Sequence, residues 1–397
     1  MSTVVKRETT LHEFPRLADA APVTATSQSF FNREFSLLEF HARVLEEALD
    51  DRNPLLERLK FLSIFSSNLD EFFMIRVSGL KEELEEEVDQ LSLDGMTPGE
   101  QLQMIRERVT PMVAEQQRCL TDEILPQLKS EGIAVVAYSS LSAAEKKALD
   151  TYYKEKVFPV LTPLAVDPTH PFPYISPLSL NLGLVVQASD GPSPADPPKF
   201  KNEPRFVRIK VPSVVPRLVP IADREESFVL VEELIQANIA TLFPGMDPGP
   251  SYCFRVTRDA DIEIREEAAE DLLRMLQREI RRRRFGSPVR LEISADMPEV
   301  LQKYLTESLD LVADDVYPME GPLGIQDLMA LYDLDRPDLK DAPFEPEVSE
   351  RLESGKPLFD VIKDRDLLVH HPYDSYSCVT DFINEAVEDP DVVAIKM

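Results

Sequence analysis

The stretch FLSIFSSNLDEFFMIRVSGLK, residues 61–81, contains a pattern that predicts a helix start, followed by a pattern that predicts a half-buried helix. Ser67 fits an N-cap and Asp70 the third helical position, so Ser-x-x-Asp is interpreted as a capping box. Apolar and long side chains then recur at three- and four-residue spacing, at Leu69, Phe72, Phe73, Arg76 and Leu80. Asn68 would then be the first helical residue, beside free backbone N–H groups and the positive end of the helix dipole.

Asn68 allows two interpretations at such a position. Helix starts attract anions, and an Asn amide offers a donor that pairs with N7 and an acceptor that pairs with N6 of adenine. The alternative is that Asn68 only contributes to the cap. The local pattern by itself favours the capping role.

Periodicity predicts a helical bundle from residue 30 to about 129, after a loose polar tail over residues 1–28. The predicted helices cover 35–49, 54–65, a third that starts at Asn68, and about 98–129. Thr97-Pro98-Gly99-Glu100 supplies a cap, a Pro at the first helical position and the Glu of a capping box. Gly132 is expected to end the fourth helix.

The middle of the chain mixes helices and strands. A helix capped by Ser142 runs towards Phe158, another covers 266–284, and a third runs from 296 to about 311. Strand-like runs occupy 178–187, 205–211, 227–231, 253–258 and 289–293. The Pro-rich segment 188–204 is expected at a hairpin tip. This part is predicted to be α+β, with helices against an antiparallel sheet.

A third unit is predicted from Pro357. Residues 366–369 are interpreted as a short strand, 375–387 as a helix and 391–397 as a buried strand. A strand–helix–strand unit is how an α/β domain begins, and a parallel sheet cannot be completed from so few residues. A chain end inside an apolar strand would leave backbone groups unpaired, so we expect a truncated form of a longer protein.

The chain of 397 residues is long enough for two or three domains, and its net charge is −29. This acidity argues against nonspecific binding of DNA or RNA and against a polybasic membrane anchor. Three scattered cysteines with no Cys-x-x-Cys predict neither a disulfide framework nor a zinc site. No stretch approaches the roughly 18 apolar residues of a membrane span. The expected location is the cytoplasm, either free or at the periphery of the inner membrane.

Several long blocks resemble, in the right order, those of the first family of polyphosphate kinases. They are FFNREFSLLEFHARVLEEALDDRNPLLERLKFLSIFSSNLDEFFMIRVSGLK (30–81), VFPVLTPLAVDPTHPFPYISPLSLNLGLVV (157–186), PRFVRIKVPSVVPRLV (204–219), FRVTRDADIEI (254–264), RRRRFGSPVRLEI (281–293) and LLVHHPYDSY (367–376). They cover nearly everything after residue 30. One departure is Leu37, where the family pattern implies Trp, and this affects packing rather than chemistry.

The resemblance implies reversible transfer of the terminal phosphate of ATP to inorganic polyphosphate through a phosphohistidine, with Mg²⁺ balancing charge. It implies a multidomain α+β fold with a helical N-terminal domain (29–132), an α+β head domain (133–325), a linker (326–356) and the incomplete start of an α/β, phospholipase D-like catalytic domain (357–397). ATP and polyphosphate are the expected partners, together with further copies of the chain in a dimer or tetramer. Asn68 matches the family asparagine that contacts adenine, which raises the nucleotide role above the capping role.

No catalytic residue and no metal ligand is assigned within the chain. The family nucleophile is marked by His-x-Lys, and none of His12, His41, His170, His370 and His371 is followed by x-Lys. The pair His370-His371 ends a predicted strand and is interpreted as structural, and His170 as support for a Pro-rich turn. The metal ligands and phosphate-binding arginines that the resemblance implies match no residue here. P-loop, Rossmann, hydrolase-elbow and zincin motifs do not occur.

Two basic sets are candidates for a polyphosphate path. The run Arg281–Arg284 closes a helix that begins with acidic residues, so a solvated helix end is favoured over a phosphate role. The second set, Arg205, Arg208, Lys210 and Arg217, flanks a strand in which Arg208 and Lys210 share a face that could line a tunnel mouth. Ordinary exposed alternation is the other interpretation of that strand.

A second function remains open for the chain as it stands. Without His-x-Lys, and with its last predicted strand incomplete, it could oligomerise or bind nucleotide without turnover.

Overall fold

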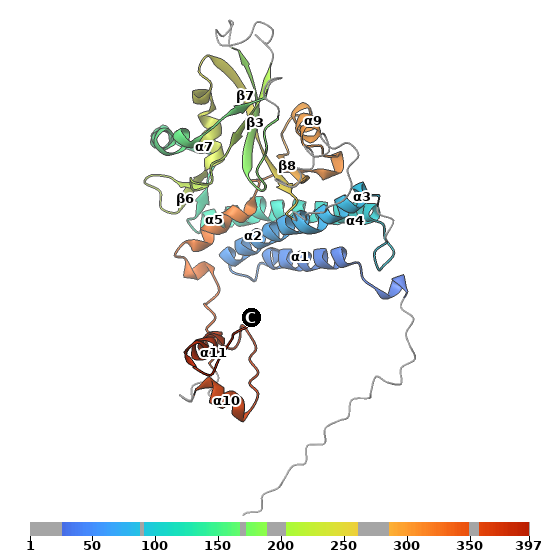
Figure 1. The fold of residues 1–397 in the computed structure, drawn as a ribbon. Coiled ribbons are helices and arrows are strands. Elements are labelled where there is room, and N and C mark those ends of the chain that lie inside the picture. The colour runs from blue at the N-terminus through green and yellow to red at the C-terminus, as the bar shows by residue number, and fades with distance from the viewer. Residues whose placement is uncertain are drawn as a thin grey trace, which may run out of the picture. The chain divides into compact units, whose positions relative to one another are not determined.

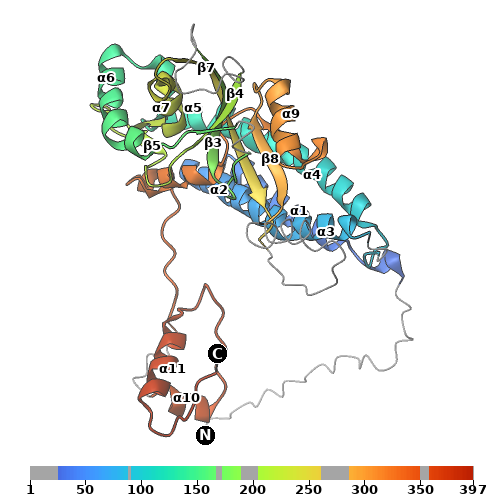
Figure 2. The ribbon, with the colours of Figure 1, turned by 45° about the horizontal axis from the view of Figure 1, so that its top comes forward.

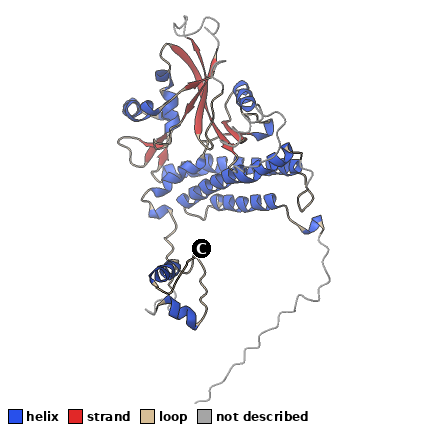
Figure 3. Cartoon of the chain, viewed as in Figure 1, coloured by secondary structure: helices blue, strands red, loops and turns tan. Residues whose placement is uncertain are grey.

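The structure is a computed structural model that describes residues 26–87, 91–166, 172–188, 204–260, 286–348 and 357–396. It divides into two compact units, with the boundary between Leu339 and Lys340. The first unit combines a layer of helices with a sheet, as the secondary-structure colouring of Figure 3 shows. The predicted combination of a helical N-terminal part with a sheet-containing middle is therefore confirmed.

The helical layer packs α1 against α2 and α4 around a common apolar core (Figure 1). Its elements are α1 (Arg33–Leu49), α2 (Leu55–Phe72), the π-helical segment η3 (Phe73–Val77), α3 (Ser78–Glu85), α4 (Pro98–Arg118), the π-helical segment η4 (Cys119–Ile124) and α5 (Leu125–Ser130). The capping box predicted at Thr97 and Glu100 is present, and Gly132 follows α5 with φ +92°. A short 3₁₀ turn, η2 (Ser27–Ser29), precedes α1.

The helix start predicted at Ser67 is wrong, because α2 runs without interruption from Leu55 to Phe72. Leu62, Phe65, Leu69 and Phe72 are all buried, so one apolar stripe continues through the serines. Serine hydroxyls compete with a helix when they bond to its own backbone. Ser66, beside the predicted start, instead donates its Oγ to Gln326 Oε1 at 3.0 Å, a partner outside the helix.

A six-stranded sheet in the order β2-β4-β3-β7-β8-β9 forms the centre of the rest of the unit. All neighbours are antiparallel except the parallel pair β8 and β9. The strands are β2 (Leu164–Ala165), β3 (Leu180–Ala188), β4 (Arg205–Lys210), β7 (Met246–Arg258), β8 (Pro288–Ser294) and β9 (Val316–Met319). The strands predicted at 178–187, 205–211, 253–258 and 289–293 are confirmed as β3, β4, β7 and β8, whereas β2 and β9 were not predicted. The predicted hairpin tip falls on residues 189–203, outside the described residues.

A three-stranded sheet, ordered β1-β6-β5, and several short helices complete the unit. The remaining elements are β1 (Ala134–Val135), η5 (Tyr138–Ser140), α6 (Ala143–Tyr152), η6 (Tyr153–Val157), η7 (Phe158–Val160), β5 (Leu218–Pro220), β6 (Ser227–Leu230), α7 (Val231–Ala237), η8 (Ile239–Leu242), α9 (Glu299–Ser308), η9 (Ala313–Asp315), η10 (Ile325–Asp333) and η11 (Pro337–Leu339). Ser142 caps α6 as predicted. The predicted helix 266–284 lies outside the described residues.

The two faces of the large sheet bury different partners (Figure 2). On one face Phe254 and Leu291 pack with Leu301 and Leu305 of α9. The opposite face contributes to the larger core shared with the helical layer and α7. The 3₁₀ helix η10 packs on α2, so residues 326–333 of the predicted linker belong to the first unit.

The second unit contains α10 (Leu358–Asp364) and α11 (Ser377–Glu388), the latter close to the predicted helix 375–387. The strand predictions for 366–369 and 391–397 are wrong, because residues 366–369 and 391–396 are not in strand conformation. A strand exists only where a neighbour completes its hydrogen-bond ladder. In the described part of this unit only an isolated bridge, between Glu347 and Asp374, is formed.

Candidate functional site

The α2 surface that carries Asn68 is the first candidate site. Asn68 is half-buried within α2, and its neighbour Ser67 is exposed. Since the helix begins at Leu55, Asn68 does not lie beside the free N–H groups of a helix start, and the helix-dipole argument does not apply to it. What remains is an amide on a regular helix surface, which can both donate and accept a hydrogen bond.

The irregularity that the sequence placed before Asn68 occurs after it, in η3. In a π-helical turn the backbone bonds span five residues, and such turns occur often at functional sites. The Met74 carbonyl accepts bonds from Ser78 Oγ at 2.7 Å and from the backbone N–H of Ala260 at 3.0 Å. The second bond joins the end of β7 to the helical layer.

A buried cluster of four charged side chains fastens α2 to the sheet. Asp70 accepts bonds from both Arg255 and Arg290, and Arg255 also bonds Glu292. The Arg255 Nη1 to Asp70 Oδ1 distance is 2.8 Å. All four residues are buried, and the two positive and two negative charges balance. Asp70, which the sequence pattern placed in a capping box, is instead an ion-pair partner of two strands.

Asp70 is ionised in this cluster. Burial raises the pKa of its carboxyl, but the nearby charges and hydrogen bonds of Arg255 and Arg290 outweigh burial and hold the pKa below its ordinary value. The Arg255 Nε donates to the Leu178 carbonyl at 3.1 Å, so the same cluster also holds the turn that contains Leu178.

A cavity of about 320 Å³ lies beside this part of α2. Ser67, Glu71 and Met74 form its helical wall, and Leu178 and Gln326 contribute from the sheet side and from η10. Gln326 is held by a 3.0 Å bond from Ser66 Oγ. Asn68 itself is not among the residues that line this cavity, although its neighbour Ser67 is.

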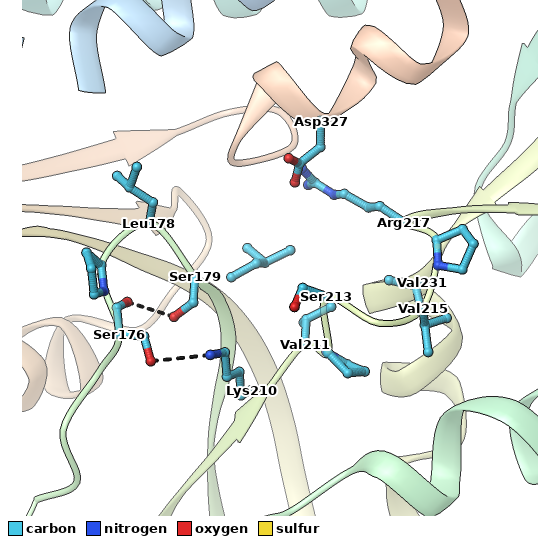
Figure 4. Close-up of a pocket in the computed structure, with 14 residues that line it drawn as sticks. Ser176, Leu178, Ser179, Lys210, Val211, Ser213, Val215, Arg217, Val231 and Asp327 are labelled. Atoms are coloured by element: carbon cyan, nitrogen blue, oxygen red, sulfur yellow. Dashed lines mark hydrogen bonds and ion pairs between the residues drawn. The ribbon is translucent and has the colours of Figure 1, made fainter. Parts of the chain in front are cut away.

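A second cavity of about 520 Å³ shares Leu178 as a wall with the first (Figure 4). The turn 176–180 and the segment 210–217 form its sides, with Lys210 and Ser176 on one side and Arg217 with Asp327 on the other. Arg217 donates to Glu232 and to Asp327, so its charge is neutralised locally. Lys210 donates to Ser176 Oγ at 3.3 Å.

The structure separates the predicted basic set. Lys210 and Arg217 line the second cavity, whereas Arg208 is buried beneath the strand surface and donates to Asn181 Oδ1 at 2.7 Å. Arg205 is half-buried at the far end of β4. The prediction that β4 exposes Arg208 is therefore wrong. The other basic run, Arg281–Arg284, lies outside the described residues.

The pair His370 and His371 lies in the second unit, in a turn closed by Asp374. The His370 backbone N–H donates to Asp374 Oδ2 at 2.6 Å, and His371 Nδ1 lies 2.8 Å from the Asp374 carbonyl oxygen. Both histidines are exposed, and residues 366–369 directly before them are not in strand conformation. Their contacts hold the turn together.

The other histidines differ in setting. His41 is buried between Phe40 and Phe72, and burial lowers its pKa despite the opposing charge of Glu71. It is therefore a neutral histidine of the apolar core. His12 and His170 lie outside the described residues. Among the residues described, no group of three or more His, Cys, Asp or Glu side chains is placed to hold a metal ion.

The sequence did not single out Arg255, Arg290 or Glu292, which are buried where the sheet meets α2, or Asn181, which is buried beside Arg208. The only sign of these residues in the sequence is the alternation of polar and apolar residues along the strands. Arg255 is flanked by apolar neighbours, as is Glu292, which places both on the polar face of a strand. That face is covered by α2, and no local pattern shows this.

Within the described residues, no helix is long and apolar enough to cross a membrane.

The chain matches the sequence models of three domains in the order N-terminal, middle and C-terminal domain 1 of polyphosphate kinase, over residues 30–136, 144–331 and 357–397.

Similar proteins bear the same description. A polyphosphate kinase of Mycolicibacterium gilvum is 47% identical over 92% of this chain and 50% of its own length. A polyphosphate kinase 1 of Chlorobaculum tepidum is 44% identical over 92% of this chain and 52% of its own length. The crystal structure of the polyphosphate kinase of Porphyromonas gingivalis, 28% identical, matches with a TM-score of 0.72 over 91% of this chain and 50% of that chain. The chain thus spans about half the length of these relatives.

Proposed function

Because the chain belongs to the polyphosphate kinase family, we propose that it acts in the reversible transfer of the terminal phosphate of ATP to inorganic polyphosphate. The match of three consecutive family domains, in their order along the chain, carries this proposal. The chain would contribute the N-terminal, middle and first C-terminal parts of the enzyme, divided near residues 132, 325 and 357.

Asn68 is proposed as a contact to the adenine base. Its amide can donate to N7 and accept from N6 of adenine. The support from geometry is a rigid setting, because the Asp70 cluster holds α2 against the sheet. A cavity is lined by the neighbouring residues Ser67, Asp70 and Glu71 of the same helix. A side chain on a rigid element loses little freedom when it binds a ligand.

The remaining chemistry is proposed from the family. The phosphate would pass through a phosphohistidine, and Mg²⁺ would accompany the phosphates of ATP and balance their charge. None of the five histidines carries the His-x-Lys mark, so we assign no nucleophile to this chain. We further propose that copies of the chain associate as a dimer or tetramer in the cytoplasm.

Asn68→Ala is expected to raise the KM for ATP about tenfold and leave kcat nearly unchanged, because a lost base contact costs roughly 1–3 kcal/mol of binding. Preference for ATP over GTP should fall with it, since the amide distinguishes N6 of adenine. Initial rates of the active enzyme with each nucleotide measure both effects. Alanine favours helix, so stability should not fall.

Gln103→Ala is the matched control, because it removes an exposed amide from α4, a different helix. It should leave both nucleotide constants unchanged. An Asn68→Ala enzyme with the wild-type KM and the wild-type ATP preference would remove Asn68 from the nucleotide site.

The second candidate function is a nucleotide-binding or oligomerising module without turnover, favoured for this chain alone by the lack of His-x-Lys. Incubation with γ-labelled ATP, Mg²⁺ and short polyphosphate distinguishes the two. Label in polyphosphate or in acid-labile phosphohistidine would show that these residues contain a nucleophile, with His370 and His371 the first to replace. Absence of label in both supports the module.

A further inference from the structure

A hydrogen-bonded network of cations and neutral groups lies behind the 520 Å³ cavity. The buried Arg208 donates to Asn181 Oδ1, and the Asn181 amide donates to the Ser179 carbonyl at 2.7 Å. Ser179 Oγ donates to the Ser176 carbonyl at 2.8 Å, and Lys210 Nζ donates to Ser176 Oγ. Two positive charges are therefore connected through amide, hydroxyl and backbone carbonyl groups, all of them neutral.

Neither cation of this network has a carboxylate partner in the described part of the chain. Arg208 is 6% exposed, and its Nη2 is buried without a hydrogen-bond partner. Burial lowers the pKa of Arg208, with no neighbouring charge to oppose it. Buried charges are normally paired, but no described residue supplies a negative group to Arg208 or Lys210.

A third cation meets the same turn. Arg258 is buried and donates to the Ile175 carbonyl at 2.7 Å and to the Gly286 carbonyl at 2.8 Å, and it lies over the Tyr174 ring at 4.6 Å. Its partners in the described structure are again neutral. The chain as a whole carries a net charge of −29. The cations beside this turn, which have no carboxylate partner among the described residues, therefore form a local excess of positive charge.

The cavity gives a ligand access to this charge. Ser176, Ser179, Ser213 and Lys210 contribute hydroxyl and ammonium groups to its lining, and Ser213 is exposed (Figure 4). Arg217 on the opposite wall is neutralised by Glu232 and Asp327. The excess charge therefore lies on the Lys210 side, within reach of an anion in the cavity.

Phosphate oxygens suit this lining best. A lysine ammonium binds phosphate as a point charge, and serine hydroxyls donate to phosphate oxygens without demanding one fixed geometry. The cavity of about 520 Å³ has room for more than one phosphate group. A chain of phosphates would pair directly with Lys210, and its negative charge would also favour the nearby charge of Arg208.

We propose that the cavity between the turn 176–180 and the segment 210–217 binds consecutive phosphate groups of inorganic polyphosphate, with Lys210 as the principal contact. This rests on the proposed function, and it adds a polyphosphate subsite within the first unit. Arg208 acts as a positioning residue, since it orients Asn181 and the serines and does not line the cavity.

Lys210→Met in the 397-residue chain is expected to weaken binding of polyphosphate of one defined length about tenfold, which is the effect of losing one charge-assisted contact. Binding should also depend less on salt, because one screened interaction is gone. Titration calorimetry at two ionic strengths measures both. Lys210→Arg should retain most of the affinity, because it keeps the charge.

Lys303→Met is the matched control, since it removes the same charge from an exposed position on α9. Equal polyphosphate affinity in Lys210→Met and Lys303→Met would overturn the subsite. Thermal denaturation of each variant verifies that it is folded before binding is compared.

The source of the phosphate is tested with ATP as a second ligand. Polyphosphate binding that depends on Lys210, while ATP binding does not, supports the subsite. Equal weakening of both ligands would assign the cavity to nucleotide phosphates and overturn the polyphosphate assignment. Failure of the nucleotide test at Asn68 would affect the proposed function without changing the Lys210 result, so the two can fail separately.

Discussion

Replacing Asp70 with asparagine is expected to lower the free energy of unfolding by about 3–5 kcal/mol, the usual cost of removing one partner from a buried ion pair. The asparagine keeps the shape of the side chain but leaves Arg255 and Arg290 with a single carboxylate, that of Glu292. Two buried guanidinium groups would then share one negative charge. Urea denaturation followed by circular dichroism measures the loss.

The same substitution should change how stability depends on pH. The pKa of Asp70 is lowered by folding, so its contribution is fully present above the ordinary value of about 3.9 and is lost as pH falls through the lowered pKa. The wild-type chain should therefore lose more stability than Asp70→Asn on acidification below about pH 4. If both proteins lost the same stability on acidification, the result would contradict an ionised Asp70.

Glu71→Gln is the matched control for Asp70→Asn. It removes one carboxylate from the next residue of α2, where the side chain is exposed. Surface substitutions of this kind change stability by roughly 0.5 kcal/mol or less. If Glu71→Gln lowered the free energy of unfolding as much as Asp70→Asn, the loss would come from a change in the helix and not from the buried cluster.

Arg217→Met is expected to cost a similar amount, about 3–5 kcal/mol, because it leaves the buried Glu232 without its partner. Arg217 donates to Glu232 through Nε at 3.1 Å and Nη2 at 2.6 Å, and to the Gly324 carbonyl at 2.6 Å. Burial lowers the pKa of Arg217, but Glu232 and Asp327 outweigh burial and raise it. The guanidinium thus joins the start of β5 to α7 and to η10.

A double-mutant cycle separates charge from packing at this position. Glu232→Gln in the Arg217→Met background removes the unpaired carboxylate, so the double variant should lose less stability than the two single losses added together. Chemical denaturation of the four proteins gives the coupling energy. Strictly additive losses would show that the ion pair contributes nothing beyond the separate packing of the two side chains.

The helical layer and the strands β3, β4, β7 and β8 were predictable because their patterns are local; the short strands β2 and β9 were not predicted. The apolar stripe of α2 and the capping boxes at Thr97 and Ser142 involve residues within a few positions of one another. The break predicted at Ser67 failed because a capping pattern also fits a helix interior. Continued burial of Leu62, Phe65 and Leu69 decides between these two possibilities.

The candidate site was predictable only in part. Asn68 was named from the sequence, and Lys210 and Arg217 were grouped as basic residues, and the structure does bring those two to one cavity. Arg208 was expected on the surface because polar alternation is usual in half-buried strands. It is buried instead, held by Asn181 of the neighbouring strand.

The family, the helical layer and the strands β3, β4, β7 and β8 followed from the amino-acid sequence, because family blocks and periodicity are read along the chain. The roles of the polar residues depend on the tertiary structure. Asp70 meets arginines 185 and 220 positions away, and Arg208 meets an asparagine 27 positions away. Such pairings depend on which sheet face a helix covers, and burial then makes an unpaired charge costly enough to select them.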